Sequence, residues 1–364
     1  MTLVLGIESS CDETACAIVR DGHAVLANII ASQHELHEEY AGVVPEIASR
    51  AHVERIVPVL RHATADAGVT LGDIDAVSVG HRPGLIGALL VGVSGAKALA
   101  WSLGKPLIGI DHIHAHLYAG LLDRPGEPSD RPPDHNELFP ALGLVVSGGH
   151  TALYRMTSPI DIKRLGATID DAVGEAYDKV ATMLDLPYPG GPNLDKIALR
   201  GDELAHDLPV SRLDRDSLDF SFSGLKTSVL YTIRGLPTRQ SDGASAFARS
   251  ASDLTEKEKA DIAASFQRAA IRALILKIER ALERFPEVRS LLVGGGVSAN
   301  SRLRHDLADL ARTRGLPLRL PPMEYCMDNA AMIAGLAYHK LRAGRNDDLS
   351  LRAEPTTRIE HFAS

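Results

Sequence analysis

The feature that most constrains the fold is a strand–turn–strand pattern that occurs twice. Residues 3–7 form an apolar run, and a second run at 15–19 follows seven small or acidic residues, Glu8-Ser9-Ser10-Cys11-Asp12-Glu13-Thr14. Residues 141–146 and 151–154 repeat the pattern around the turn Ser147-Gly148-Gly149-His150. Short apolar runs bounded by turn residues are typical of buried strands. The repetition predicts a duplicated architecture, in which each half opens on a hairpin whose turn faces a shared cleft.

Length and composition agree with an α/β protein of two domains. The chain has 364 residues with 45% hydrophobic residues, 4% aromatic residues and 31 glycines, and a length above about 250–300 residues favours more than one core. No window reaches the roughly 18 unbroken apolar residues of a membrane span. The N-terminus meets Glu8 without a basic region, unlike a signal peptide. Cys11, Cys16 and Cys326 form no Cys-x-x-Cys pair, as in a reducing compartment. We therefore expect a cytoplasmic protein without membrane association.

The net charge of −8 argues against binding nucleic acid by bulk electrostatics, because phosphate contacts need concentrated Lys and Arg. An RNA substrate would need a local basic patch or a partner subunit. The densest basic set is Arg302, Arg304, Arg312, Arg314 and Arg319. A solvated helix face is the alternative explanation for it.

The order of the predicted elements gives a domain division. Apolar periodicity predicts helices at 44–63, 85–99, 256–285 and 301–312. We expect a first lobe at 1–122, completed by a C-terminal helix region at about 326–345, and a second lobe at 139–325. Residues 123–138 are rich in turn formers and read as a linker. Residues 346–364 are the C-terminal tail, and 236–255 is a polar insert.

Three histidines in five residues mark a candidate metal site. They follow the apolar run 106–110 in Asp111-His112-Ile113-His114-Ala115-His116. On a helix, His112 and His116 are i and i+4 on one face and can converge on a divalent metal. A metalloprotease would also need Glu after the first histidine, where this chain has Ile113. If the segment is instead a strand, all three imidazoles share one face and form only a polar surface.

The second half contains carboxylates and glycines in a pattern suited to a ligand. Thr168-Ile169-Asp170-Asp171 predicts a helix start, after which Asp171, Glu175 and Asp178 lie on one helical face. Because like charges at this spacing repel, a metal, ligand hydroxyls, or Lys179 and solvent should offset them. Gly294-Gly295-Gly296-Val297-Ser298-Ala299-Asn300 lies between a strand and a helix, a layout for a nucleotide at a helix N-terminus, but it is neither a Rossmann nor a P-loop motif. Asp328 is placed as a helix cap, which is also its simplest role.

These stretches, taken in order, resemble a known family. The resemblance rests on Gly6 to Thr14, His112-x-x-x-His116, Ser147 to Thr151, Asp170 to Lys179, Tyr188-Pro189-Gly190-Gly191-Pro192, Phe220 to Thr227, Gly294 to Asn300 and Asp328-Asn329. Together they resemble the bacterial tRNA N6-adenosine threonylcarbamoyltransferases of the actin/Hsp70/sugar-kinase superfamily. The implied fold is α/β with two duplicated lobes and a ligand cleft between them.

The resemblance also implies an activity and a site. A threonylcarbamoyl group would pass from threonylcarbamoyl-AMP to N6 of the adenosine 3′ of the anticodon, in tRNAs reading ANN codons. His112, His116 and Asp328 would bind one divalent metal, iron(II) or alternatively zinc. The residues implied to hold the adenylate, or ATP/ADP, are Val145, Val146, Ser147, Gly148, Gly149, Asp178, Gly191, Asp195 and Asn300. Asp12 is the candidate acid/base or positioning group, with a structural turn role as its alternative. The implied partners are tRNA, an inactive paralogous subunit and a small ATPase.

Three departures from the family pattern are visible. His114 replaces a frequent Glu, and Met327 replaces the usual Thr, but neither position is a ligand. His81-Arg82-Pro83-Gly84 replaces a commoner Ala-Gly-Pro-Gly and changes the expected loop there.

Two other functions compete with the transferase. One is a metal-independent small-molecule kinase of the same superfamily, which would not need His112 and His116. The other is a non-catalytic nucleotide-binding scaffold.

Overall fold

A computed structural model of the chain describes residues 1–37, 40, 42–124, 126–130, 132–211, 213–214, 216–239 and 245–357. The chain divides into two compact units. Unit 1 comprises Met1–Asn136, Thr157–Ile162 and Pro321–Ser364. Unit 2 comprises Glu137–Met156 and Lys163–Leu320. Each unit is organised around one five-stranded sheet.

The sheet of unit 1 has the order β3-β2-β1-β4-β5. The first three strands form an antiparallel meander, and β4 and β5 are parallel to β1. The strands are β1 (Leu3–Glu8), β2 (Glu13–Arg20), β3 (Ala24–Ser32), β4 (Ala76–Arg82) and β5 (Leu107–Asp111). Every residue of β1 is buried, which explains the apolar run at residues 3–7.

The sheet of unit 2 repeats this arrangement. Its order is β12-β11-β6-β7-β8, with β6 and β7 antiparallel and with β11 and β12 parallel to the β6 direction. The strands are β6 (Ala141–Val146), β7 (Thr151–Ser158), β8 (Asp161–Ala167), β11 (Ser290–Gly294) and β12 (Leu318–Arg319). In each sheet the first strand in sequence, β1 or β6, is central. The next two strands in sequence lie on one side of it, and two later strands lie on the other side. The predicted duplicated α/β fold is confirmed.

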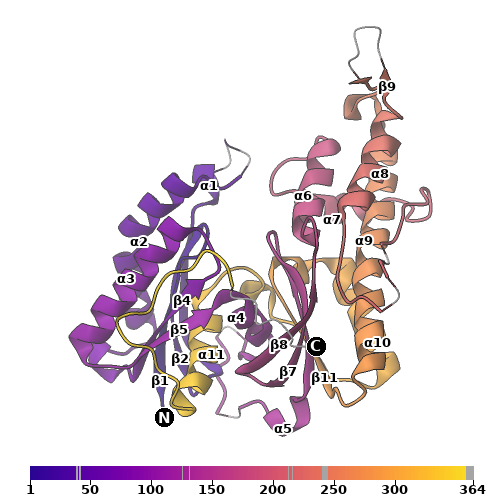
Figure 1. Cartoon of the computed structure of the whole chain (residues 1–364). Helices are drawn as coiled ribbons and strands as arrows, with labels where there is room; N and C mark the ends of the chain where they lie inside the picture. The colour runs from indigo at the N-terminus through magenta and orange to yellow at the C-terminus, as the bar shows by residue number, and fades with distance from the viewer. Residues whose placement is uncertain are drawn as a thin grey trace. The chain divides into compact units, whose positions relative to one another are not determined.

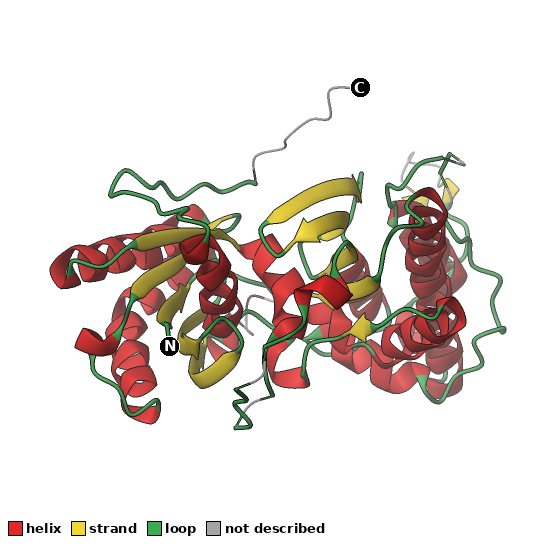
Figure 2. Ribbon diagram, turned by 90° about the horizontal axis from the view of Figure 1, so that it is seen from below, coloured by secondary structure: helices red, strands yellow, loops and turns green. Residues whose placement is uncertain are grey.

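Helices flank the strands of both sheets (Figure 2). In unit 1 they are α1 (His34–His37), α2 (Pro45–Asp66), η2 (Leu71–Asp73), α3 (Ile86–Leu103), α4 (His112–Tyr118), η3 (Ala119–Leu121), η6 (Met323–Tyr325) and α11 (Ala330–Arg342). The short helix α5 (His135–Leu138) lies where the two units join in sequence. In unit 2 they are α6 (Val173–Met183), α7 (Gly190–Ala198), α8 (Ser223–Arg234), η4 (Ala251–Asp253), α9 (Glu256–Arg284), η5 (Gly296–Ala299) and α10 (Ser301–Arg314). In unit 1, α2 and α3 pack together beside the sheet, and α11 packs on β1, β2, β4 and β5 (Figure 1).

The predicted helices are present with nearly the predicted limits, because their ends carry local signals. Helix α9 begins after Thr255, whose side chain forms a capping box with Glu258. Helix α3 ends at Leu103, and the following residue, Gly104, adopts φ 62° as its C-cap. Two predicted helix starts were wrong. Asp328 does not cap α11, because Asn329 is the N-cap residue and its side chain accepts the amide of Met332 at 3.0 Å. Thr168 to Asp171 do not start a helix, because α6 begins at Val173 behind Ala172. Thr168 instead bonds to the carbonyl of Asp171.

The segments predicted as linker and insert contain some regular structure. The last residues of 123–138 form α5, and in 236–255 the described residues include β9 (Thr238–Arg239) and β10 (Ser245–Ala246), which pair antiparallel. Residues 125, 131 and 240–244 of these segments lie outside the described residues. The described part of the tail, up to Thr357, belongs to unit 1.

Among the described residues, helix α3 is long and apolar enough to cross a membrane by length and composition. In the fold it packs against β4 and α2. Gly87 lies against Ser49 of α2 and Gly95 against Ile56, so its small residues permit close helix packing. The apolar residues on its buried face are therefore accounted for by its place in unit 1, whereas Ile86, Leu90 and Trp101 are exposed.

Close packing of α11 on the first strand brings its N-terminal loop to the end of that strand. A Cβ on Gly6 would lie 2.4 Å from the carbonyl oxygen of Ala330. Only glycine allows the first turn of α11 to approach β1 so closely. Asp328, two residues before α11, is thereby held near the carboxyl end of the unit 1 sheet.

Candidate metal centre

The two histidines predicted as ligands lie on one short helix that follows a buried strand. Helix α4 begins at His112 because Asp111, the last residue of β5, caps it: Oδ1 of Asp111 accepts the amides of Ile113 (3.0 Å) and His114 (3.4 Å). The imidazoles of His112 and His116 therefore share a face, with ring centroids 4.6 Å apart. The helical interpretation of the histidine segment is confirmed.

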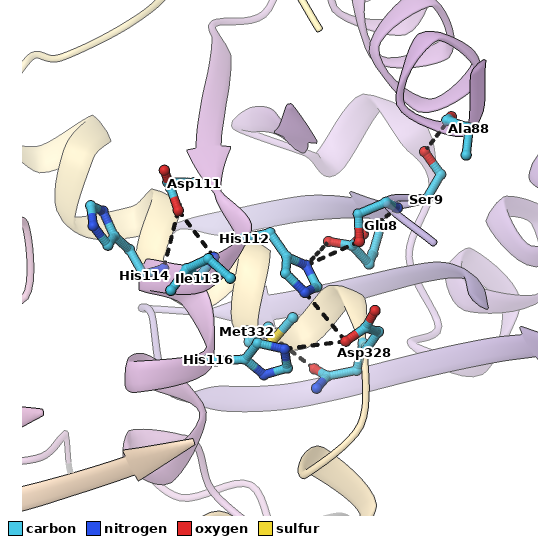
Figure 3. A network of polar contacts seen from close by, with 12 residues as sticks. Glu8, Ser9, Ala88, Asp111, His112, Ile113, His114, His116, Asp328 and Met332 are labelled. Atoms are coloured by element: carbon cyan, nitrogen blue, oxygen red, sulfur yellow. Dashed lines mark hydrogen bonds and ion pairs between the residues drawn. The ribbon is translucent and has the colours of Figure 1, made fainter. Parts of the chain in front are cut away.

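Asp328 faces both imidazoles (Figure 3). Its Oδ1 lies 3.3 Å from Nε2 of His112 and 3.1 Å from Nε2 of His116. One ligand atom from each of the three residues lies within 4.8 Å of the others. Both histidines are buried, with 7% and 0% of their surface exposed. All three residues belong to unit 1.

A fourth residue, which the sequence did not assign, orients one of the ligands. Oε2 of Glu8, at the end of β1, lies 3.0 Å from Nδ1 of His112. The other Glu8 oxygen accepts the amide of Ser10 at 2.6 Å, and the Ser10 hydroxyl lies 3.2 Å from the same Nδ1. A carboxylate behind the far nitrogen is what metal-bound histidines usually have. The signal in the sequence was an acidic residue directly following the apolar run 3–7.

The charge balance of the site also fits a cation. Within the described part of the chain, no Lys or Arg forms an ion pair with Glu8 or Asp328. Burial raises the pKa of neighbouring Glu13, and the charges of Asp328 and Asp12 raise it further. Burial by itself would lower the pKa of His112, but Asp328 and Glu8 raise it above its usual value. Burial by itself would raise the pKa of Asp328, but the two histidines lower it. Burial and the nearby His112 lower the pKa of His116. A cation bound at this site would balance the carboxylate charges of Asp328 and Glu8.

The two histidines are not equally supported. His112 has Glu8 and Ser10 at its Nδ1. Nδ1 of His116 is buried and, among the described residues, has no hydrogen-bond partner. The donor set nevertheless fits a divalent metal, because two imidazole nitrogens and a carboxylate oxygen converge on one point with an orienting carboxylate behind.

The residues predicted to hold the adenylate all lie in unit 2. Val145 and Val146 end β6, and the turn Ser147–Gly149 joins it to β7. Gly174, in the first turn of α6, packs against the Ser147 carbonyl. Gly295, at φ 93°, packs against the carbonyl of Val146. Strand β6, the start of α6 and the glycine-rich loop after β11 therefore meet at this turn.

The remaining predicted substrate residues are hydrogen-bonded at three places in unit 2. Oδ1 of Asp178 accepts the amide of Gly191 at 3.1 Å. Asp195 accepts both the amide (3.0 Å) and the hydroxyl (2.8 Å) of Ser301. Asn300 is buried, caps α10 through the amide of Leu303, and donates to Gln267 at 2.9 Å. Each of these side chains therefore already has a structural partner within unit 2.

The predicted strip of three carboxylates has protein partners. Asp171 precedes α6 and pairs with Lys179 at 2.8 Å and with Lys226. Glu175 pairs with Lys179 at 2.7 Å. The sequence left open whether a metal, a ligand or Lys179 offsets the carboxylate charges. In the structure Lys179 does so, together with Lys226.

Two other predicted groups have the following surroundings. Asp12 lies in the β1–β2 turn, where its carbonyl accepts the amide of Gln33 at 3.0 Å. The candidate basic patch is largely paired: Arg302 bonds to Glu203 and Asp306, Arg312 to Asp309, and Arg314 to Glu283. The arginine set therefore matches the alternative of a solvated, ion-paired helix face.

Two sheets of the same strand order, one in each unit, define the α/β fold class of actin, Hsp70 and the sugar kinases. Among solved structures, HypF of T. kodakarensis has a TM-score of 0.57 at 16% identity, covering 96% of this chain and 49% of that one. This likeness concerns the fold alone.

The sequence comparisons then give the family. The model for tRNA N6-adenosine threonylcarbamoyltransferase (TsaD) matches residues 24–335. The protein of that name from Moorella thermoacetica is 49% identical over 354 residues, covering 97% of this chain and 96% of the relative. The Symbiobacterium thermophilum protein of the same name has the same identity and coverage. The chain belongs to this family of transferases.

Proposed function

We propose that this protein transfers the threonylcarbamoyl group of threonylcarbamoyl-AMP to N6 of the adenosine 3′ of the anticodon, in tRNAs that read ANN codons. The exocyclic amine forms a bond to the carbamoyl carbon. The bond from that carbon to the phosphate oxygen breaks, and AMP leaves with the electron pair. The observation that carries the proposal is the convergence of His112, His116 and Asp328 in a member of this family.

Those three residues would hold one divalent metal, iron(II) in our proposal, with zinc as the alternative. When bound, such a metal supplies Lewis acidity and orients substrate oxygens. Glu8 keeps the proton of neutral His112 on Nδ1, so that the Nε2 lone pair remains available. This arrangement supports a site that binds metal with neutral imidazoles.

Bare backbone at the β6–β7 turn would bind the adenylate phosphate. Gly148 and Gly149 are exposed, and a Cβ on either would meet nothing within 4 Å. Neither packing nor a positive φ therefore requires glycine here, which leaves close approach by a ligand as a physical reason. Gly191 has the same open surroundings, and its amide points at Asp178. Asp178 and Asp195 would contact the ribose with their remaining lone pairs, and Asn300 the adenine region.

Asp12 would accept the proton released by the attacking amine. It lies in the β1–β2 turn directly before Glu13, whose pKa is raised first by burial and then by the nearby carboxylates Asp328 and Asp12. This proximity supports a position of Asp12 beside the metal ligands. In this role Asp12 acts as the general base at the turn of the first hairpin.

The partners would be tRNA, an inactive paralogous subunit and a small ATPase, acting in the cytoplasm. The ion-paired arginines of α10 and the net charge of −8 support a need for help in holding tRNA. Exposed apolar side chains on the packed helices α2 and α3 support a protein partner there. They are Val53, Val57, Ile86 and Leu90, which expose 62%, 53%, 46% and 51% of their surface.

The test supplies the purified protein, its proposed partners, threonylcarbamoyl-AMP and unmodified tRNA, and measures threonylcarbamoyladenosine by mass spectrometry. We expect product with the wild type and with His114→Ala, and none with His112→Ala. Product formation by a His112→Ala protein that contains no metal would contradict the role given to the metal. Phosphorylation of a small molecule by metal-free protein would instead favour the kinase.

A further inference from the structure

The C-terminal segment 345–357, here called the strap, covers the edge of the unit 1 sheet. Strand β5 is an edge strand, and the strap runs beside it (Figure 1). The amide of Asp347 donates to the carbonyl of Leu107, and the Asp347 carboxylate accepts the amide of Gly109, both at 2.8 Å. Leu351 fills the space over Gly109, where a Cβ would lie 2.7 Å from its side chain. The strap thus satisfies strand groups that would otherwise remain open.

Beyond β5, the strap binds residues 81–84, at the end of β4 and directly after it. Nδ1 of His81 donates to the carbonyl of Arg352 at 3.0 Å, and the amide of Glu354 donates to the carbonyl of His81 at 2.9 Å. The amide of Gly84 donates to the carbonyl of Pro355 at 3.3 Å. The strap therefore holds residues 81–84 by three hydrogen bonds.

Arg82 connects the strap to the helix that carries the histidines. Its Nη1 lies 3.2 Å from Glu354, and its Nε lies 3.2 Å from Oδ2 of Asp111. The Asp111 side chain is only 3% exposed, and the ion pair with Arg82 compensates its charge. The other Asp111 oxygen, Oδ1, caps α4 at Ile113 and His114. The guanidinium of Arg82 therefore fixes the orientation of the Asp111 carboxylate that caps α4.

We propose that Glu354 and Arg82 position α4 through Asp111, and that the strap thereby sets the affinity of the His112–His116–Asp328 site for its metal. Helix α4 has 7 residues, too few to be stable without its cap and its packing. A rotation of the Asp111 carboxylate, which caps α4, would shift the first residue of the helix, His112. Arg82 and Glu354 act here as positioning residues. The metal part of this proposal rests on the proposed function.

The experiment compares Glu354→Gln and Arg82→Lys with the wild type in the full-length chain. Glu354→Gln keeps the size of the side chain but removes its charge, and Arg82→Lys keeps the charge but lacks the fork that reaches two carboxylates. The matched control is Asp130→Asn, which removes the carboxylate of another unit 1 ion pair, with Arg20, at a side chain that is 95% exposed. Zn²⁺ affinity is measured by calorimetry, and exchange of the Ile113 and His114 amides is measured in metal-free protein by NMR.

We expect both variants to bind Zn²⁺ about tenfold more weakly than Asp130→Asn, and their two amides to exchange roughly tenfold faster. Affinity and exchange within twofold of the control would overturn the proposal. The amide readout decides the positioning role even if the wild type binds no Zn²⁺. If the wild type failed to modify tRNA while the variants still showed both effects, the proposed function would fail and the role of the strap would stand.

Discussion

Replacing Glu8 with Gln tests whether a buried carboxylate prepares His112 to bind metal. In the wild type, one Glu8 oxygen accepts the amide of Ser10 and the other faces Nδ1 of His112. A glutamine can keep only one of these acceptors. If its NH₂ faces His112, the ring must accept at Nδ1, and its proton moves to Nε2, where the metal should bind. If its oxygen faces His112, its NH₂ opposes the Ser10 amide, and two donors meet.

The magnitude follows from the contacts that remain. Loss of a hydrogen bond to a charged group costs about 1.5–3 kcal/mol. The Ser10 hydroxyl, 3.2 Å from the same Nδ1, can accept its proton in place of Glu8. We therefore expect the low end of that range in Glu8→Gln, about 1.5 kcal/mol, which is roughly tenfold in the metal dissociation constant. Mutations of such orienting groups typically weaken metal binding about 10–100-fold.

The assay is titration of metal-free protein with Co²⁺, followed by calorimetry and by visible absorption, which reports the ligand geometry. Glu54→Gln, the same change at an exposed position of α2, is the control. We expect the wild-type affinity for the control and an affinity about tenfold weaker for Glu8→Gln. An unchanged affinity and spectrum in Glu8→Gln would refute the assignment of Glu8 as the group that orients His112.

The other predictions concern the ligands, the nucleotide turn and a buried histidine. His112→Ala and His116→Ala should each abolish stoichiometric metal binding by elemental analysis, whereas His114→Ala, on the same helix, should retain it. Gly148→Ala should leave the free energy of unfolding within about 0.5 kcal/mol, because the site is open, but weaken adenylate binding at least about tenfold; equal calorimetric affinity would refute a phosphate contact there. Burial lowers the pKa of His339 from 6.5 to about 3, so the unfolded chain binds a proton first as the pH falls below 6.5. Stability should then decline by up to about 1.4 kcal/mol per pH unit down to about pH 3, and denaturant titrations of His339→Phe should lack that contribution.

The sequence predicted the repeated sheets because β1, β2, β6 and β7 carry uninterrupted apolar runs with polar turns between them. It also predicted the ligand pair, since the i, i+4 spacing of His112 and His116 acts within one helix. It failed where partners are distant in sequence. Asp171 looked like part of a ligand site because Lys226, its second partner, is contributed by another helix. Likewise, nothing local to Arg82 indicates that Asp111 and Glu354 lie beside it.

Because the proposed metal ligands are far apart in sequence, metal binding would also stabilise the fold of unit 1. His116 and Asp328 are separated by 212 positions, and their contact joins α4 to the loop before α11. Without metal, the contact depends on protons shared among the two imidazoles and the carboxylates of Asp328 and Glu8. A divalent ion would replace those protons and bind only the arrangement in which α11 is packed on β1, so its binding free energy adds to the folding free energy of unit 1. Because Gly6 permits that packing, a side chain at position 6 should weaken metal binding although it contributes no ligand.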